Sequence, residues 1–175
     1  MFSVQSLFAA GIGCALLAAV SGVTPSLAGE AQAAVMGPSG LPLPRFVSLK
    51  TNEGNARRGP GLTHRIDWVF TRAGMPLRVT AEYENWRRIE DAEGAGGWVH
   101  YTMLSGSRTV LVMQDMVNVL DAPDDAARVA FQAEAGVVGR VQECSTDWCR
   151  IGVDGNRGWL RKAALWGVEA GELVD

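Results

Sequence analysis

The chain has 175 residues, of which 47% are hydrophobic and 20% are charged, and its formal net charge at pH 7 is -3. This composition is ordinary for a globular protein and too apolar for an intrinsically disordered one. A slightly acidic chain without a long basic cluster also lacks the cationic face that nucleic-acid phosphates require, so we expect no nucleic-acid partner.

The N-terminus is typical of a secretory signal peptide. Residues 7–20 form an apolar run of about 14 residues, shorter than the roughly 20 needed to span a bilayer. Ser26-Leu27-Ala28 then offers the small residues that signal peptidase reads, although no Lys or Arg precedes the run. We therefore expect residues 1–28 to be cleaved off and the protein to be exported to the periplasm or cell envelope with no membrane segment; an uncleaved anchor is the alternative.

Two short segments flank the part of the chain that is expected to fold. Residues 29–44 are rich in Ala, Gly and Pro, so we expect a flexible leader with nothing to pack against. Residues 168–175 are acidic, and we expect a loose tail.

Residues 45–105, which we call copy 1, predict a small all-β domain. Short runs rich in β-branched and aromatic residues cover 46–50, 66–71, 77–82, 86–91 and 97–100, and turns with Gly, Pro or Asn separate them. In one of these runs Leu77, Val79 and Ala81 alternate with polar residues, which is the period of a half-buried strand.

Residues 106–167, which we call copy 2, repeat this pattern about 62 residues later. The expected strands cover 109–113, 128–133, 137–144, 148–154 and 157–161. The composition of 124–133 would also allow a helix, but the matching segment 65–70 of copy 1 is strand-like. A drift of one residue between matched segments indicates small loop changes between two copies of one fold.

The residues shared by the two copies resemble those of bacterial SH3-like domains. Copy 1 carries the turn pattern Asn55, Arg57, Gly59 and Pro60, then Trp86, Ile89, Gly97 and Trp98. Copy 2 keeps Asn118, Pro123, Trp148, Ile151, Gly158 and Trp159 but has Leu120 and Ala122 where the Arg and Gly of the pattern would stand. The resemblance covers about residues 45–167. It implies an all-β fold with one five-stranded, partly open barrel per copy, and a binding role toward peptidoglycan peptides or an envelope protein.

Cys144 and Cys149 are predicted to form a disulfide. They flank a four-residue polar loop between two expected strands, and opposed residues of an antiparallel pair lie within the distance that a disulfide spans. An oxidising compartment after export favours the bond. Shifting back by 62 residues places Glu82 and Arg87 at the same positions, where we expect an exposed cross-strand ion pair. A redox-active pair is the alternative, but such enzymes generally have two intervening residues beside a helix N-terminus.

The remaining polar residues do not form a recognisable catalytic or metal-binding pattern. His64 and His100 are the only histidines, and both lie in copy 1, which has no cysteine to act as a nucleophile. The acidic clusters fall at turns and lack the alternate spacing of a calcium loop. We therefore expect no enzyme activity, no cofactor and no metal. An envelope hydrolase with a Cys149–His100 pair, or a purely structural interaction module, stays the alternative.

Surplus aromatic residues in copy 1 are the candidates for ligand contact: Trp68, Tyr83, Trp86, Trp98 and Tyr101. SH3-type barrels receive extended peptides on an aromatic wall. Trp86 and Trp98 have counterparts in copy 2, which also fits a core role, whereas Trp68, Tyr83 and Tyr101 are matched with Ala130, Ser145 and the Lys162 region. We therefore expect copy 1 to bind and copy 2 to stabilise.

Overall fold

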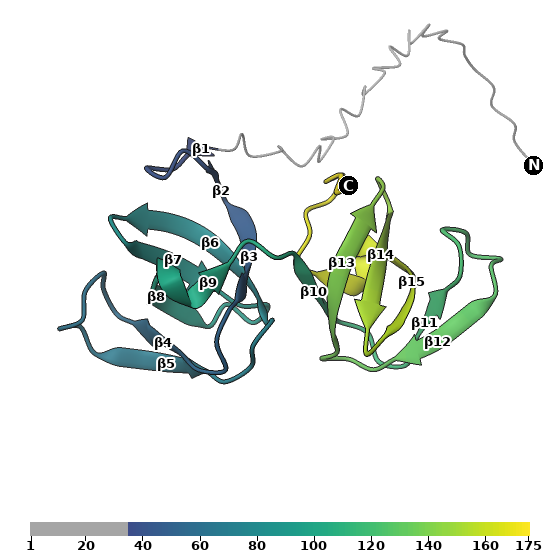
Figure 1. The fold of residues 1–175 in the computed structure, drawn as a ribbon, viewed down its shortest axis with the longest axis horizontal. Helices are drawn as coiled ribbons and strands as arrows, with labels where there is room; N and C mark the ends of the chain where they lie inside the picture. The colour runs from purple at the N-terminus through teal and green to yellow at the C-terminus, as the bar shows by residue number, and fades with distance from the viewer. Residues whose placement is uncertain (1–34) are drawn as a thin grey trace, which may run out of the picture. The chain divides into compact units, whose positions relative to one another are not determined.

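The computed structural model describes residues 35–175 (Figure 1), so the predicted signal peptide lies outside the described residues. The described chain is all β apart from two 3₁₀ helices, η1 (Tyr101–Met103) and η2 (Lys162–Ala164), which confirms the predicted class. Within residues 35–175, no helix has the length and hydropathy to cross a membrane.

Each copy forms one open seven-stranded sheet. The strands of copy 1 are β3 (Arg45–Leu49), β4 (Gly54–Arg57), β5 (Ile66–Phe70), β6 (Pro76–Tyr83), β7 (Trp86–Glu90), β8 (Gly96–His100) and β9 (Leu104–Ser105). The strands of copy 2 are β10 (Thr109–Val112), β11 (Val117–Leu120), β12 (Val129–Ala133), β13 (Val138–Cys144), β14 (Trp148–Val153), β15 (Asn156–Arg161) and β16 (Leu165–Trp166).

The two sheets have the same strand order, β5-β4-β8-β7-β6-β3-β9 in copy 1 and β12-β11-β15-β14-β13-β10-β16 in copy 2. The repeat found in the sequence is therefore a repeat of the fold. The five strands expected in each copy are present. Four further strands were not predicted: β4 and β9 in copy 1, and β11 and β16 in copy 2. They have only two to four residues each, which is too short to show alternation.

Each copy has its own apolar core, built from the inward residues of alternating strands. In copy 1, Leu49, Leu77, Val79, Ile89 and Val99 are at most 2% exposed. The core of copy 2 is formed in the same way and includes the disulfide.

A close backbone approach explains the repeated Gly-Trp pattern. A Cβ added to Gly97 would lie 2.6 Å from the carbonyl oxygen of Arg57, and one added to Gly158 would lie 2.6 Å from that of Leu120. Gly97 also has a φ of 152°, which L side chains rarely adopt. Glycine at these positions lets β8 and β15 meet the ends of β4 and β11, where Arg57 pairs with Trp98 and Leu120 with Trp159.

The segments that flank the copies are more ordered than the sequence indicated. Within the leader expected over 29–44, β1 (Val35–Met36) and β2 (Pro42–Leu43) form a hairpin. At the other end, Val174 exchanges two backbone hydrogen bonds with Cys144, at 2.7 and 3.1 Å. The acidic tail thus pairs with β13 instead of lying free.

The predicted disulfide is present. Cys144 and Cys149 are directly opposed on β13 and β14, with their Cα atoms 4.1 Å apart. Both are buried, at 4% and 0% exposure, so the bond is part of the core.

The two copies belong to one compact unit and touch each other. The ring of Phe46 meets that of Trp166 edge to face at 5.0 Å, and the Thr109 hydroxyl donates a hydrogen bond of 2.7 Å to the Gly74 carbonyl. These contacts follow from a connection of only a few residues between β9 and β10.

Replacing Gly97 or Gly158 by Ala is expected to lower the free energy of unfolding by about 2 kcal/mol or more, since the new methyl group would overlap a backbone carbonyl. Gly106→Ala is the control, because nothing lies within 4 Å of a Cβ there, and its effect should stay within about 0.5 kcal/mol. Chemical denaturation of the three variants measures this. Equal stability of all three would contradict the close approach.

The double change Cys144→Ala with Cys149→Ala is expected to cost about 2 kcal/mol, the entropy of the short loop that the bond closes. Denaturant titration of oxidised wild type and variant gives the difference. Alkylation of the unfolded, non-reduced protein should leave both cysteines unlabelled and should label them only after reduction. Labelling of both before reduction would show that the bond is absent.

Candidate functional site

The ladder between β7 and β8 brings several of the predicted aromatic residues together. Trp86 is paired with His100, and the two rings meet edge to face at 5.5 Å. Tyr101 follows at the start of η1, with its ring 5.0 Å from that of His100. Tyr83 is the partner of Trp86 on β6. We call Tyr83, Trp86, His100 and Tyr101 the aromatic end.

The aromatic end contains a buried tryptophan and two half-exposed tyrosines. Trp86 is only 8% exposed, whereas Tyr83 is 53% and Tyr101 49% exposed. The guanidinium of Arg87 lies 5.9 Å from the centre of the Tyr101 ring, a cation–π distance. His100 Nδ1 lies 2.8 Å from the Thr102 hydroxyl, which orients the imidazole. The aromatic end thus presents two half-exposed tyrosines next to the packed rings of Trp86 and His100.

Trp68 lies apart from the aromatic end. It is 47% exposed on the edge strand β5, 6.4 Å from Phe70, and lines a hollow of about 360 Å³. The strand register also corrects its match in copy 2. Ala56 pairs with Trp68 as Val119 pairs with Phe131, so the counterpart of Trp68 is Phe131 and not Ala130. The prediction that Trp68 has no aromatic counterpart is therefore wrong, because the offset is 63 in this hairpin.

The turn pattern that starts with Asn55 shapes the loop between β4 and β5. Arg57 donates hydrogen bonds to the carbonyls of Leu62 at 2.9 Å and His64 at 2.7 Å. Gly59 leaves room for the His64 ring, which a Cβ there would meet at 2.7 Å. In the structure these residues hold the loop conformation.

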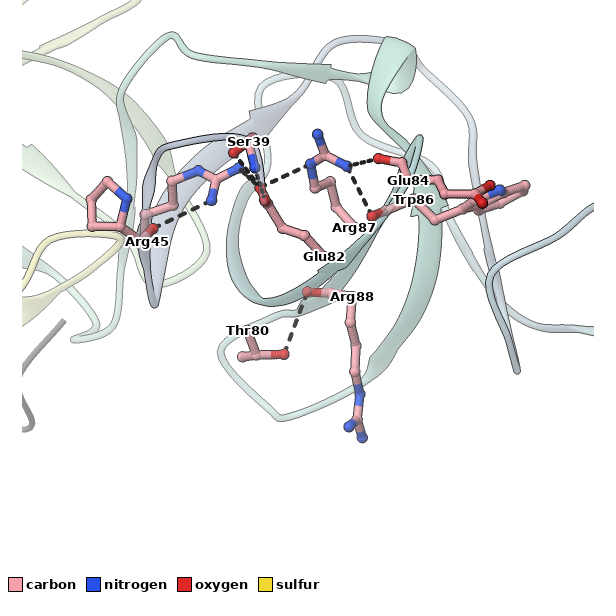
Figure 2. Close-up of polar contacts among 9 residues, drawn as sticks. Ser39, Arg45, Thr80, Glu82, Glu84, Trp86, Arg87 and Arg88 are labelled. Atoms are coloured by element: carbon pink, nitrogen blue, oxygen red, sulfur yellow. Dashed lines mark hydrogen bonds and ion pairs between the residues drawn. The ribbon is translucent and has the colours of Figure 1, made fainter. Parts of the chain in front are cut away.

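Glu82 forms a buried polar network at the C-terminal end of β6, next to Tyr83 (Figure 2). Its side chain has no solvent exposure and lies 2.6 Å from an Arg45 nitrogen and 3.1 Å from Arg87 Nε. The backbone N–H and hydroxyl of Ser39 both donate to it at 2.8 Å. The ion pair expected to be exposed is therefore buried, because the β1–β2 hairpin lies over it.

The electrostatics of Glu82 follow from these contacts. Burial opposes ionisation, but the hydrogen bonds from Ser39 and Arg45 outweigh it and lower the pKa of Glu82 from 4.5 to about 2. Glu82 and Arg87 are opposed on the ladder as Cys144 and Cys149 are, which confirms their equivalence. Ser39 and Arg45 were not predicted as partners of Glu82, although Gly37-Pro38-Ser39-Gly40 is a turn signal.

A second surface lies next to the aromatic end, and of its residues only Trp98 was predicted to contact a ligand. Trp98 is half-buried on β8 and is paired with Arg57 on one side and Arg88 on the other. These three residues, with Arg58, Asp67, Glu90 and neighbouring backbone, line a hollow of about 430 Å³. We call it the arginine hollow.

Residues 35–175 hold neither a cluster of metal-ligating side chains nor a free cysteine thiol. In the part of the chain that the structure covers, no three His, Cys, Asp or Glu side chains converge on a possible metal position. Cys149 is held in the disulfide, so its thiol is not available as a nucleophile beside His100.

Two consecutive segments, residues 50–106 and 113–167, match the family model of the bacterial SH3 domain. The chain belongs to this family. The fold class and the tandem arrangement expected from the sequence are thereby confirmed.

Two solved structures are similar at low identity, NlpC2 and NlpC1 from Trichomonas vaginalis, with 15% and 14% identity and TM-scores of 0.34 and 0.33. Each alignment covers 70% of this chain and 48% or 45% of the other. The chain thus spans about half the length of these proteins. No curated protein sequence matches it.

The two bacterial SH3 domains differ at the aromatic end. In the second domain Arg161 takes the place of His100 opposite the tryptophan, and its guanidinium lies 4.4 Å from the centre of the Trp148 ring. Asp125 accepts a hydrogen bond of 2.8 Å from Arg161 Nε. The second SH3 domain therefore covers its own tryptophan with an ion pair, whereas the first leaves two tyrosines exposed.

The depressed pKa of Glu82 predicts an acid-labile contribution to stability. Because the folded pKa is about 2 and the ordinary value is 4.5, the contribution is complete above about pH 5 and is lost as the pH falls toward 2. Glu82→Gln should therefore reduce the fall in unfolding free energy over this window by about 2 kcal/mol, the scale of hydrogen bonds to a charged group. Denaturation at several pH values measures it.

Glu84→Gln is the matched control, since Glu84 is exposed on the adjoining turn. It should keep the wild-type pH dependence. If Glu82→Gln also kept it, the buried network would not be the cause.

Proposed function

We propose that this protein is a non-catalytic binding module of the bacterial cell envelope, whose first SH3 domain binds peptidoglycan stem peptides through the aromatic end. The observation that carries the proposal is the pair of half-exposed tyrosines, Tyr83 and Tyr101, on either side of the fixed Trp86–His100 pair. Bacterial SH3 domains are interaction modules, and this arrangement supplies the contact surface.

The chemistry of the aromatic end suits an extended peptide. Tyrosine rings give a large apolar face at a low cost in side-chain entropy, and their hydroxyls can bond to peptide groups. Trp86 and His100 are locked by ring packing and by Thr102, so the surface is preorganised. Extended, proline-rich peptides dock on SH3 domains in aromatic-lined grooves, and the aromatic end offers a comparable surface.

The second SH3 domain is less suited to the same ligand. Ser145 stands where the first domain has Tyr83, and Lys162 stands where it has Tyr101. Lys162 is buried and its Nζ donates to the Glu172 carbonyl. A ligand there would have to displace the Arg161–Asp125 pair, so this domain serves mainly as a scaffold.

Two features support a location in the envelope. Residues 1–28 are typical of a secretory signal peptide. The Cys144–Cys149 disulfide is of the kind that persists in an oxidising compartment.

The purified protein is expected to co-sediment with isolated sacculi. Tyr83→Ala and Tyr101→Ala should each weaken retention by about tenfold, the scale of an aromatic hot spot. Met113→Ala is the control, because Met113 is comparably exposed at 47% but lies in the second domain. The bound fraction is measured as a function of sacculus concentration.

Two outcomes would contradict the proposal. Indifference to sacculi together with specific recovery of one envelope protein would assign the aromatic end to a protein partner. Release of peptidoglycan fragments by the pure protein would show that it is an enzyme.

A further inference from the structure

We infer that the arginine hollow is a subsite for a carboxylate group, so that the ligand of the first SH3 domain is an acidic peptide. The inference extends the proposed function, because it gives the chemistry of the ligand that the aromatic end would hold.

The arginine hollow continues the aromatic end along the same face of the sheet. On the β7–β8 ladder, the pair Trp86–His100 is followed two residues later by the pair Arg88–Trp98. Side chains two residues apart on a strand share a face and lie about 7 Å apart. One extended peptide can therefore lie on the tyrosines and reach the hollow with its next side chain on that face.

The charges around the hollow leave arginine in excess. Asp67 uses both carboxylate oxygens, accepting from Arg58 Nε at 3.0 Å and from Arg65 Nε at 2.6 Å. These bonds lower its pKa, so it stays ionised and paired. Glu90 lies 3.7 Å from a nitrogen of Arg78. Asp67 is thus paired with two arginines, and Glu90 is paired with Arg78, which also lies 3.7 Å from Glu169.

Arg88 and Arg57 have no carboxylate partner among residues 35–175. Arg88 is exposed, and among residues 35–175 no ion pair or hydrogen bond of its guanidinium is found. In Figure 2 its side chain points away from the Glu82 network, and only its backbone carbonyl is bonded, to Thr80. Arg57 is paired with Trp98 on the side opposite to Arg88. Its guanidinium donates to two backbone carbonyls, which are neutral and so do not compensate its charge.

This combination is suited to a carboxylate. A guanidinium can donate two parallel hydrogen bonds to a carboxylate, and charge-assisted bonds of this kind are about twice as strong as neutral ones. The half-buried indole of Trp98 between the two arginines lowers water access on one side, which strengthens the interaction.

The second SH3 domain lacks this arrangement. Leu120 takes the place of Arg57 beside the matching Trp159, and Asp121 takes the place of Arg58 at the same loop-closing hydrogen bond. Arg150 is the counterpart of Arg88, since it pairs with Trp159. Arg150 thus provides a matched control with the same tryptophan neighbour but without the cationic surroundings.

The test uses two capped pentapeptides, Ala-Ala-Glu-Ala-Ala and Ala-Ala-Gln-Ala-Ala, which differ only in the single carboxylate. Each is titrated into the full-length oxidised protein while the indole N–H signals are followed by NMR. We expect the Glu peptide to shift the Trp98 signal and to bind at least tenfold more tightly than the Gln peptide. The preference should weaken with added salt.

Arg88→Gln should remove this preference, whereas Arg150→Gln should keep it. Equal affinity for the two peptides, no detectable binding of either, or a preference that survives Arg88→Gln would overturn the inference. Equal loss in both variants would show a general charge effect and would overturn it as well. The backbone spectrum of each variant confirms that it is folded.

The two proposals can fail separately. Retention on sacculi that depends on Tyr83 and Tyr101 but not on Arg88 would leave the proposed function intact and overturn the carboxylate subsite. If the protein bound the Glu peptide specifically but did not co-sediment with sacculi, the carboxylate subsite would stand and the proposed function would be overturned.

Discussion

The close approach of Gly97 to the Arg57 carbonyl is the constraint on which the first domain depends. It lets β8 meet the end of β4, and the pair Arg57–Trp98 forms at that point. Arg57 then holds the β4–β5 loop through two carbonyls. Because Gly158 and Leu120 make the same approach in the second domain, the constraint belongs to the fold. The residue that bears this carbonyl, Arg57 or Leu120, decides whether the tryptophan has a cationic neighbour.

The two domains also fill one structural position with different chemistry. At the end of the β6–β7 hairpin and of the β13–β14 hairpin, the opposed residues are an ion pair in one case and a disulfide in the other. Each position is covered by a terminal segment: the β1–β2 hairpin lies over Glu82, and Val174 forms an isolated bridge with Cys144. A disulfide needs no further partner, whereas a buried carboxylate must have its lone pairs satisfied. Ser39 and Arg45 donate to these lone pairs. The β1–β2 hairpin, which contains Ser39, is therefore held in place by the buried carboxylate of the first domain.

Local sequence pattern was sufficient for the five expected strands of each copy, the repeat and the disulfide, because each depends on alternation, turn residues or spacing within one hairpin. It was not sufficient for Glu82, whose burial comes from Ser39, 43 residues away. It also misplaced Trp68, since a loop difference of one residue shifts the match from Ala130 to Phe131. The arginine hollow depends on the pairing of β4 with β8, which no short-range pattern contains.

The difference between the domains is explained by which groups are already satisfied. The loops 58–65 and 121–128 are closed by the same backbone hydrogen bond, so Leu62 corresponds to Asp125. Asp125 holds Arg161 over Trp148, and a ligand at that tryptophan would have to break a charged pair. Leu62 can form no such pair and is 77% exposed. A ligand at the aromatic end of the first domain would therefore have no such ion pair over the tryptophan to break.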